Sequence, residues 1–195
     1  MMQRHVSIGR ARAASVVAGL IILVPPALAQ SPKIGDPPEA NNMRLIGYND
    51  LHGRSAYQPT IHHQGSRYIA YVGHHGGTPE VPQPINRLTG RAENNGTSIV
   101  DVTDPTQPKY LAHIPGLQGH YEEGGAQMVR VCDGKTLPKG DASKTYLLRV
   151  FGGRAHEIWD VTDPAKPTLL TKIVEGLKNA TPASPISCPA SKAGG

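Results

Sequence analysis

Histidines are the residues in this sequence with the clearest capacity to bind a metal. Two adjacent pairs, His62-His63 and His74-His75, lie close together along the chain. A hairpin with its turn over residues 64 to 67 would place the pairs at opposite ends of two strands, about 20 Å apart at roughly 3.3 Å per residue. The ligands of one zinc ion all lie about 2 Å from the metal, so the two pairs are not expected to share an ion.

The ends of neighbouring strands predict a different grouping. In a unit of four antiparallel strands, the starts of the first and third strands share one rim with the ends of the second and fourth. The residues that fall on this rim are His52, His74, His75, His120, Glu122, Glu123 and His156. The candidate ligands of a divalent metal there are His74, His75, His120, Glu122 and His156. Their spacing is irregular and matches no zinc motif, so we predict no cofactor, with a divalent metal as the alternative.

Signatures of covalent catalysis are missing from the sequence. The pattern Gly-x-Ser-x-Gly, which marks the serine nucleophile of one large class of hydrolases, does not occur. His62, His63 and Cys132 belong to the opposite rim, and we interpret them as structural. No catalytic residue is therefore predicted.

The elements that would position the rim are indicated by a repeated phrase. Residues 98–111 read SIVDVTDPTQPKYL and residues 157–170 read EIWDVTDPAKPTLL. Each phrase predicts a strand, a turn and a second strand. An Asp side chain can accept a hydrogen bond from the backbone two residues on, and Pro presets φ for the second position of a type I turn. The residues assigned this structural role are Asp101, Asp104, Pro105, Asp160, Asp163 and Pro164.

The repeat extends toward the N-terminus of each phrase. Residues 55–65 match residues 124–134, and residues 67–77 match residues 145–154, so that His63 aligns with Cys132. Each unit is thus expected to contain four strands in series.

The boundaries of the units follow from this match. The first unit spans about residues 55–116 and the second about 124–176. Polar insertions at 78–97 and 135–144 are expected to be surface loops. Residues 43–50 resemble the last strand of a preceding unit.

The fold class follows from composition and pattern. The chain holds 22 Gly and 18 Pro, and short β-branched runs separated by turn residues replace any long helical periodicity. Repeated four-stranded units predict an all-β, β-propeller-like fold of two antiparallel blades plus a leading strand. A closed ring needs about 4 to 8 blades. We therefore expect a fragment or truncated form of a longer protein, or else a small protein that completes its ring by self-association.

The motifs SIVDVTDPTQP and EIWDVTDPAKP resemble those of the LVIVD-repeat family. The resemblance covers about residues 43–176. It implies an exported bacterial protein with a β-propeller fold, and it supplies no catalytic residues.

The two ends of the chain differ from the repeat region. Three arginines precede the apolar run AASVVAGLIILV, and Ala27-Leu28-Ala29 provides a cleavage signal, so residues 1–29 are predicted to be a signal peptide. The alternative is an amphipathic or buried N-terminal helix. The apolar run is too short to span a membrane, which needs roughly 20 residues. Residues 30–42 are predicted to be a linker and residues 177–195 a disordered tail, and the protein is expected to be periplasmic or secreted.

Charge and cysteine content limit the partners. The formal net charge is +5, and the leader contributes three of these charges, so we expect neither a nucleic-acid partner nor a membrane anchor. Cys132 and Cys188 could pair in an exported chain, but Cys132 lies in a strand-like stretch and Cys188 in a loose tail, which favours two separate thiols. Self-association through the outer faces of both blades is expected, because neither face has a partner blade.

The function expected from these features is an exported, non-enzymatic binding or scaffold module for an unknown ligand or protein. The alternative is a metal-dependent hydrolase or oxidoreductase with a His/Glu site on one rim. A propeller fold by itself does not distinguish the two, because propellers serve both as binding proteins and as hydrolases.

Overall fold

The structure is a computed structural model that describes residues 41–78, 80, 82–120 and 123–173. All of these residues belong to the compact unit that begins at residue 40. The predicted signal peptide and tail, nearly all of the predicted linker, and Glu122 and Cys188 lie outside the described residues.

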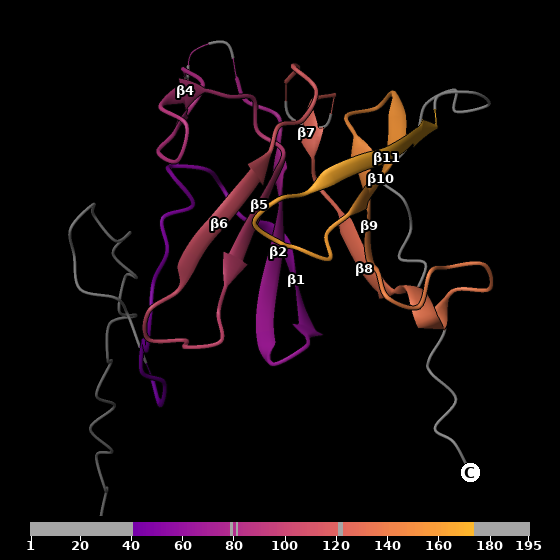
Figure 1. Ribbon diagram of the computed structural model, residues 1–195. Helices are drawn as coiled ribbons and strands as arrows, with labels where there is room; N and C mark the ends of the chain where they lie inside the picture. Colours follow the sequence, from indigo (N-terminus) through magenta and orange to yellow (C-terminus); the bar gives the residue numbers. More distant parts are fainter. Residues whose placement is uncertain (1–40, 79, 81, 121–122, 174–195) are drawn as a thin grey trace, which may run out of the picture. The chain divides into compact units, whose positions relative to one another are not determined.

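The described chain is all-β and antiparallel, and it contains two main sheets (Figure 1). The first sheet has the order β1 (Tyr57–Gln64), β2 (Arg67–His75), β5 (Thr97–Asp101) and β6 (Lys109–Ile114), and β7 (Gly125–Ala126) pairs with the end of β2. The second sheet contains β8 (Val129–Asp133), β9 (Thr145–Phe151), β10 (Ala155–Asp160) and β11 (Thr168–Ile173), each beside the next. Neither sheet closes into a barrel. The predicted fold class, two four-stranded blades of an incomplete propeller-like fold, is confirmed.

The two Asp-Pro turns have matching hydrogen bonds. Asp101 Oδ1 accepts from the Thr103 amide at 2.9 Å, and Asp160 Oδ1 accepts from the Thr162 amide at 3.0 Å. One turn further on, Asp104 and Asp163 accept from the second amide after them at 2.9 and 3.0 Å. Their carbonyls close turns in which Pro105 and Pro164 are the second residues. The repeated sequence thus produces the same local structure twice.

Hydrogen bonds from the preceding strand to each of these turns correct the predicted alignment. The Tyr68 amide donates to Thr103 Oγ1 at 3.0 Å, and the Thr145 amide donates to Thr162 Oγ1 at 3.1 Å. Tyr68 is therefore equivalent to Thr145, one residue away from the match that the sequence predicted. The shift arises because the first hairpin turns tightly whereas the second carries the insertion at 135–144.

The same shift changes which residue of the first sheet is equivalent to Cys132. His63 pairs with Tyr68, and Cys132 pairs with Tyr146. Cys132 is consequently equivalent to His62 and not to His63. Cys132 is disulfide-bonded, so the prediction of two separate thiols was wrong. The interpretation of His62 and His63 as structural agrees with their contacts: His62 Nε2 lies 2.9 Å from Asp133 Oδ1, and His63 stacks on Tyr68.

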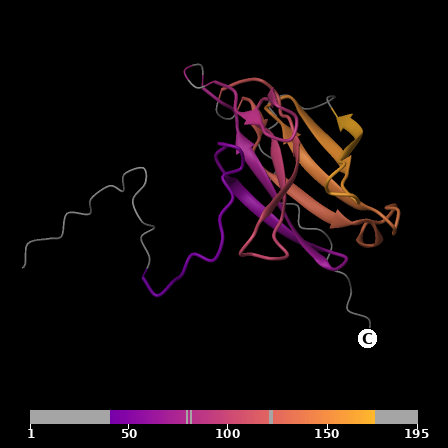
Figure 2. The same cartoon turned by 60° about the vertical axis from the view of Figure 1, so that its left-hand side comes forward.

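The two sheets lie beside each other (Figure 2), and one apolar core contains residues of both. Its buried members are Ile69, Tyr71, Ile99, Ala112 and Ile114 from the first sheet, with Val129, Val131, Leu147 and Val161 from the second sheet and the turn after it. Trp159 packs against this core. Each fully buried aliphatic side chain contributes about 1.5–3 kcal/mol, so the interface is a major source of stability.

The other face of the first sheet is covered by the chain itself, contrary to the expectation that it would be exposed. Ala70, Val72 and Val100 form a second buried cluster, against which Leu51 packs. The insertion expected to be a loop contains a short hairpin, β3 (Ile85–Asn86) and β4 (Arg91–Ala92). Residues 50–56 and the insertion from 84 to 93 are called the cap below.

The predicted leading strand is not formed. Residues 43–50 contain no strand, and Met43, Leu45 and Tyr48 are exposed. Asn49 Nδ2 donates to the Pro108 carbonyl at 3.2 Å, which attaches this segment to the loop before β6. A strand at this position needs a neighbouring blade to pair with, and the described chain supplies none.

Helical structure in the described residues is limited to one 3-10 turn, η1 (Gly134–Thr136). None of these residues belongs to a helix long and apolar enough to cross a membrane.

Candidate functional site

The predicted rim ligands take up separate positions. His74 is fully buried in β2, whereas His75 is half-buried and makes an edge contact with Tyr57. His120 is exposed. His156 lies in the second sheet between Val150 and Ile173. Glu122 lies outside the described residues.

These positions do not form a metal site among the residues that the structure describes, where no three His, Cys, Asp or Glu side chains are placed to hold an ion. The strand ends do share a rim, but side chains of successive strand residues point to opposite faces. A rim position therefore does not determine which face a histidine takes.

His74 instead begins a buried chain of hydrogen bonds. Its Nδ1 contacts the carbonyl oxygen of Ser55, which can only accept, so Nδ1 carries the proton. Nε2 then accepts from the Ser98 hydroxyl at 2.7 Å, and Ser98 Oγ accepts from the Tyr110 hydroxyl at 2.8 Å. The direction of every bond in this chain is fixed by the one carbonyl at its end.

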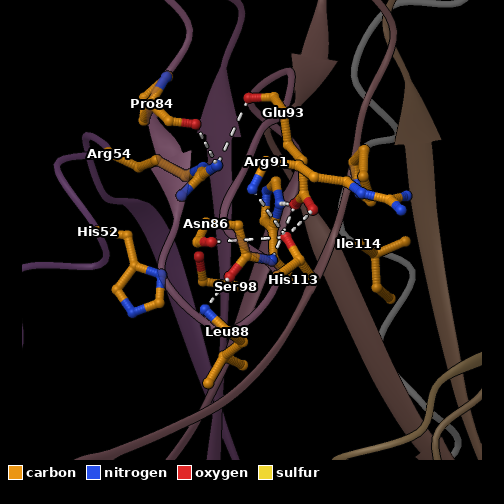
Figure 3. A network of polar contacts seen from close by, with 12 residues as sticks. His52, Arg54, Pro84, Asn86, Leu88, Arg91, Glu93, Ser98, His113 and Ile114 are labelled. Carbon is orange, nitrogen blue, oxygen red and sulfur yellow. Dashed lines mark hydrogen bonds and ion pairs between the residues drawn. The ribbon is translucent and has the colours of Figure 1, made fainter.

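A second histidine extends this network toward the cap (Figure 3). The His113 side chain is fully buried, and its Nδ1 lies 2.7 Å from Glu93 Oε2. The same carboxylate accepts from Asn86 Nδ2 and Thr89 Oγ1, both at 2.9 Å. The His74 and His113 rings lie 6.2 Å apart, so the two sets of bonds occupy one region on the outer face of the first sheet.

Burial controls the charge of both histidines. Loss of solvation lowers the pKa of His74 to about 4. It lowers the pKa of His113 to about 3, although the Glu93 carboxylate opposes this change. The pKa of Glu93 is also lowered: burial raises it, but the donors His113, Asn86 and Thr89 outweigh burial. At neutral pH the pair is an imidazole that donates to a carboxylate.

Arg54 joins the cap to this network. The residue is 5% exposed, and its Nη2 donates to the carbonyls of Pro84 at 3.2 Å and Glu93 at 3.5 Å. Its other two guanidinium nitrogens and His113 Nε2 are buried without a hydrogen-bond partner in the described part of the chain. Such groups typically cost about 1–3 kcal/mol each, so the network is not optimised for stability alone.

The Ser98–His74 pair has the geometry of an activated nucleophile but not the access. A serine hydroxyl that donates to an imidazole whose other nitrogen is oriented by an acceptor is the arrangement found in serine hydrolases. Both residues are 0% exposed. Neither appears among the described residues that line the rim pocket considered below. A substrate therefore has no path to this hydroxyl in the structure.

A second buried polar cluster lies between the sheets. Arg149 donates to Glu157 Oε2 from Nε at 2.9 Å and from Nη2 at 2.8 Å. Its guanidinium also donates to the carbonyls of Ile114 at 2.8 Å and Pro115 at 2.7 Å. Lys172 Nζ lies 2.7 Å from Glu157 Oε1. Arg149 thus bonds its own sheet and the backbone of the other sheet at once.

The described surface also contains a pocket of about 440 Å³ on the rim. It lies between residues 77–78 and 82–84 on one side and residues 117–120 on the other, and His120 is in its wall. The amide side chains of Gln83, Asn94, Asn95 and Gln118 provide both donors and acceptors. Asn95 Oδ1 is buried without a partner among the described residues, although its Nδ2 donates to the His75 carbonyl at 2.9 Å. This pocket can accept a neutral, polar group.

Apart from His74, which was grouped with the rim, sequence reasoning did not identify the buried residues of either cluster. Arg149 and Glu157 interrupt apolar strands, TYLLRVF and AHEIWD, and a charge inside such a strand was the available signal. Glu93 and Arg54 gave no such signal, because they lie in segments that read as loops.

Comparisons with protein-family models, curated proteins and solved structures found no match. The resemblance to the LVIVD-repeat family therefore rests on the repeated motif.

Proposed function

We propose that this chain is an exported, non-enzymatic binding or scaffold module built from LVIVD-type propeller blades. The observation that carries the proposal is the use made of its polar side chains. His74, Ser98 and His113 are sealed beneath the cap, and Arg149 and Glu157 are sealed between the sheets. Groups with the capacity for acid–base or nucleophilic chemistry are thus placed where they hold the fold together.

The proposed binding site is the rim pocket. Its amides lie in loops between strands of the first sheet. Binding sites usually combine a concave surface with a few positioned polar groups. The ligand is expected to be a small neutral molecule or a polar loop of a partner protein.

A combined metal and activity measurement tests the proposal against its alternative, a metal-dependent hydrolase or oxidoreductase. Purified protein is analysed for bound divalent metals and assayed with ester and phosphoester substrates. The proposal expects no stoichiometric metal and no turnover. One tightly bound metal per chain, together with turnover that is lost in His120→Ala, would overturn it.

A second experiment addresses the pocket. A panel of small polar compounds is screened for an increase in the melting temperature, and hits are repeated with Gln118→Trp, which fills the pocket. Lys139→Trp is the matched control, because Lys139 is also exposed but lies in the 135–144 insertion. Stabilisation that survives Gln118→Trp would exclude this pocket.

A further inference from the structure

The interface between the two sheets indicates how another blade would dock. In the first sheet, the docking face contains Ile69, Tyr71, Ile99, Ala112 and Ile114. Equivalent positions follow from the shared turn hydrogen bonds and the strand registers. In the second sheet these positions are Tyr146, Leu148, Ile158, Thr171 and Ile173. The second sheet docks onto the apolar face of the first sheet, and it carries a similar, mostly apolar face of its own.

This repeated face of the second sheet, called the open face, belongs to neither apolar core cluster of the described residues. Tyr146, Leu148 and Ile158 are half-buried, and Ile173 is 44% exposed.

The complementary face lies on the first sheet, beneath the cap. Ala70, Val72 and Val100 are equivalent to Leu147, Arg149 and Trp159, which dock the second sheet onto the first. Val72, Ser98 and His113 form one row across the first sheet, as Arg149, Glu157 and Lys172 do across the second.

The cap supplies the charges that this row lacks. In the second sheet, Glu157 accepts from Lys172 and from Arg149. In the first sheet, the equivalent row contains His113, but Val72 and Ser98 replace the arginine and the glutamate. Glu93 of the cap lies 2.7 Å from His113, and Arg54 of the cap lies beside Glu93. The cap thus places over the first sheet a carboxylate and a guanidinium like those that the second sheet carries within its own row.

We propose that the cap prevents head-to-tail assembly of this chain. Without the cap, the outer face of the first sheet would be exposed. This face of one copy could then dock onto the open face of a second copy, as the second sheet docks onto the first within each chain. Such an interface joins unlike faces, so it propagates into open-ended chains unless the rotation closes a ring. The partner that fits the open face is therefore an uncapped second copy.

Sedimentation velocity of the full chain over a range of concentrations tests the proposal. The uncapped variant is Arg54→Ala with Glu93→Ala, and circular dichroism checks that its strands persist. The wild-type chain is expected to show no open-ended growth, and the uncapped variant a weight-average mass that rises about two-fold or more with concentration. If the double variant unfolds, Glu93→Gln, which removes only the charge, is expected to show the same growth to a smaller extent.

A third substitution identifies the face used. Leu148→Glu in the uncapped background is expected to abolish growth, whereas Leu88→Glu, at an exposed position on the cap, is expected to leave it. A folded uncapped variant that stays at constant mass would overturn the proposal. Open-ended growth of the wild type would also overturn it, as would growth that Leu148→Glu does not reduce.

Discussion

Arg149 in β9 donates a hydrogen bond of 2.8 Å to the carbonyl oxygen of Ile114 in β6. The bond joins a charged side chain of the second sheet to the backbone of the first, at the edge of the apolar core that both sheets share. With the bond of 2.7 Å from Arg149 to the Pro115 carbonyl, it forms a buried polar link between the two repeated units.

Replacement of Arg149 is expected to destabilise the whole unit. Arg149→Met leaves the Glu157 carboxylate, which is 1% exposed, with Lys172 and Trp159 as its remaining partners among the described residues. It also removes the donor to two backbone carbonyls. Breaking a buried pair in this way typically costs about 3–5 kcal/mol. Urea unfolding measures the loss.

The matched control removes both charges. Arg149→Met with Glu157→Leu is expected to recover much of the lost stability, because the uncompensated charge is gone. A loss below about 1 kcal/mol in the single variant would contradict a structural role for Arg149.

The repeated aspartates are expected to contribute similarly to stability. Asp101→Ala and Asp160→Ala each remove the acceptor of a turn amide, and a hydrogen bond of this kind contributes about 0.5–1.5 kcal/mol. Asp160→Asn, which keeps an acceptor oxygen, is expected to lose less than Asp160→Ala. A large effect at one aspartate and none at the other would contradict the equivalence of the two turns.

Stability is expected to fall on acidification from about pH 6.5 toward pH 4. His74 and His113 have pKa values of about 4 and about 3 in the folded chain, below the ordinary 6.5. The unfolded chain therefore binds protons first as the pH falls. The free energy of unfolding then decreases by up to about 1.4 kcal/mol per pH unit for each histidine. The contribution of the two histidines to stability is fully present above pH 6.5, and it is lost as the pH falls toward their pKa values in the folded chain.

Urea unfolding across this pH range checks the effect. The variant His74→Gln with His113→Gln is expected to be less stable at pH 7 but to have a flatter profile. An unchanged slope in this variant would show that other groups cause the pH dependence.

Two glycines on β2 and the loop after it are expected to respond differently to alanine. A Cβ on Gly73 would lie 2.0 Å from the Gln127 carbonyl oxygen, whereas a Cβ on Gly77 would meet no atom within 4 Å. Overpacking of this kind costs about 1–3 kcal/mol. Thermal melts should thus show a clear loss for Gly73→Ala and almost none for Gly77→Ala; equal effects would contradict the close approach of residues 126–127 to β2.

The sequence allowed the strands to be predicted more reliably than the site. The Asp-Val-Thr-Asp-Pro phrases marked the turns after β5 and β10, because Asp and Pro have strong local preferences that tertiary packing did not override. The match between residues 67–77 and 145–154 was wrong by one residue, because similar residue types were aligned across hairpins with different turns.

The candidate site depends on contacts that sequence periodicity does not encode. The rim grouping placed His74, at the end of one strand, and His156, at the start of another, on one rim. The structure instead buries His74 under the cap and leaves His156 half-buried on the second sheet. Glu93 reaches His113 only because the insertion folds back over the first sheet, a long-range contact between segments that each read as ordinary loop or strand.

The most direct test of the shared core is equilibrium urea unfolding followed in parallel by two probes. Trp159 is the only tryptophan and packs at the interface between the sheets, whereas far-UV circular dichroism reports on the strands of both sheets. If the two blades share one core, both probes should give a single coincident transition, and Arg149→Met should shift both equally. A tryptophan transition that separates from the dichroism transition, or moves alone in Arg149→Met, would show that the blades fold independently and contradict the account.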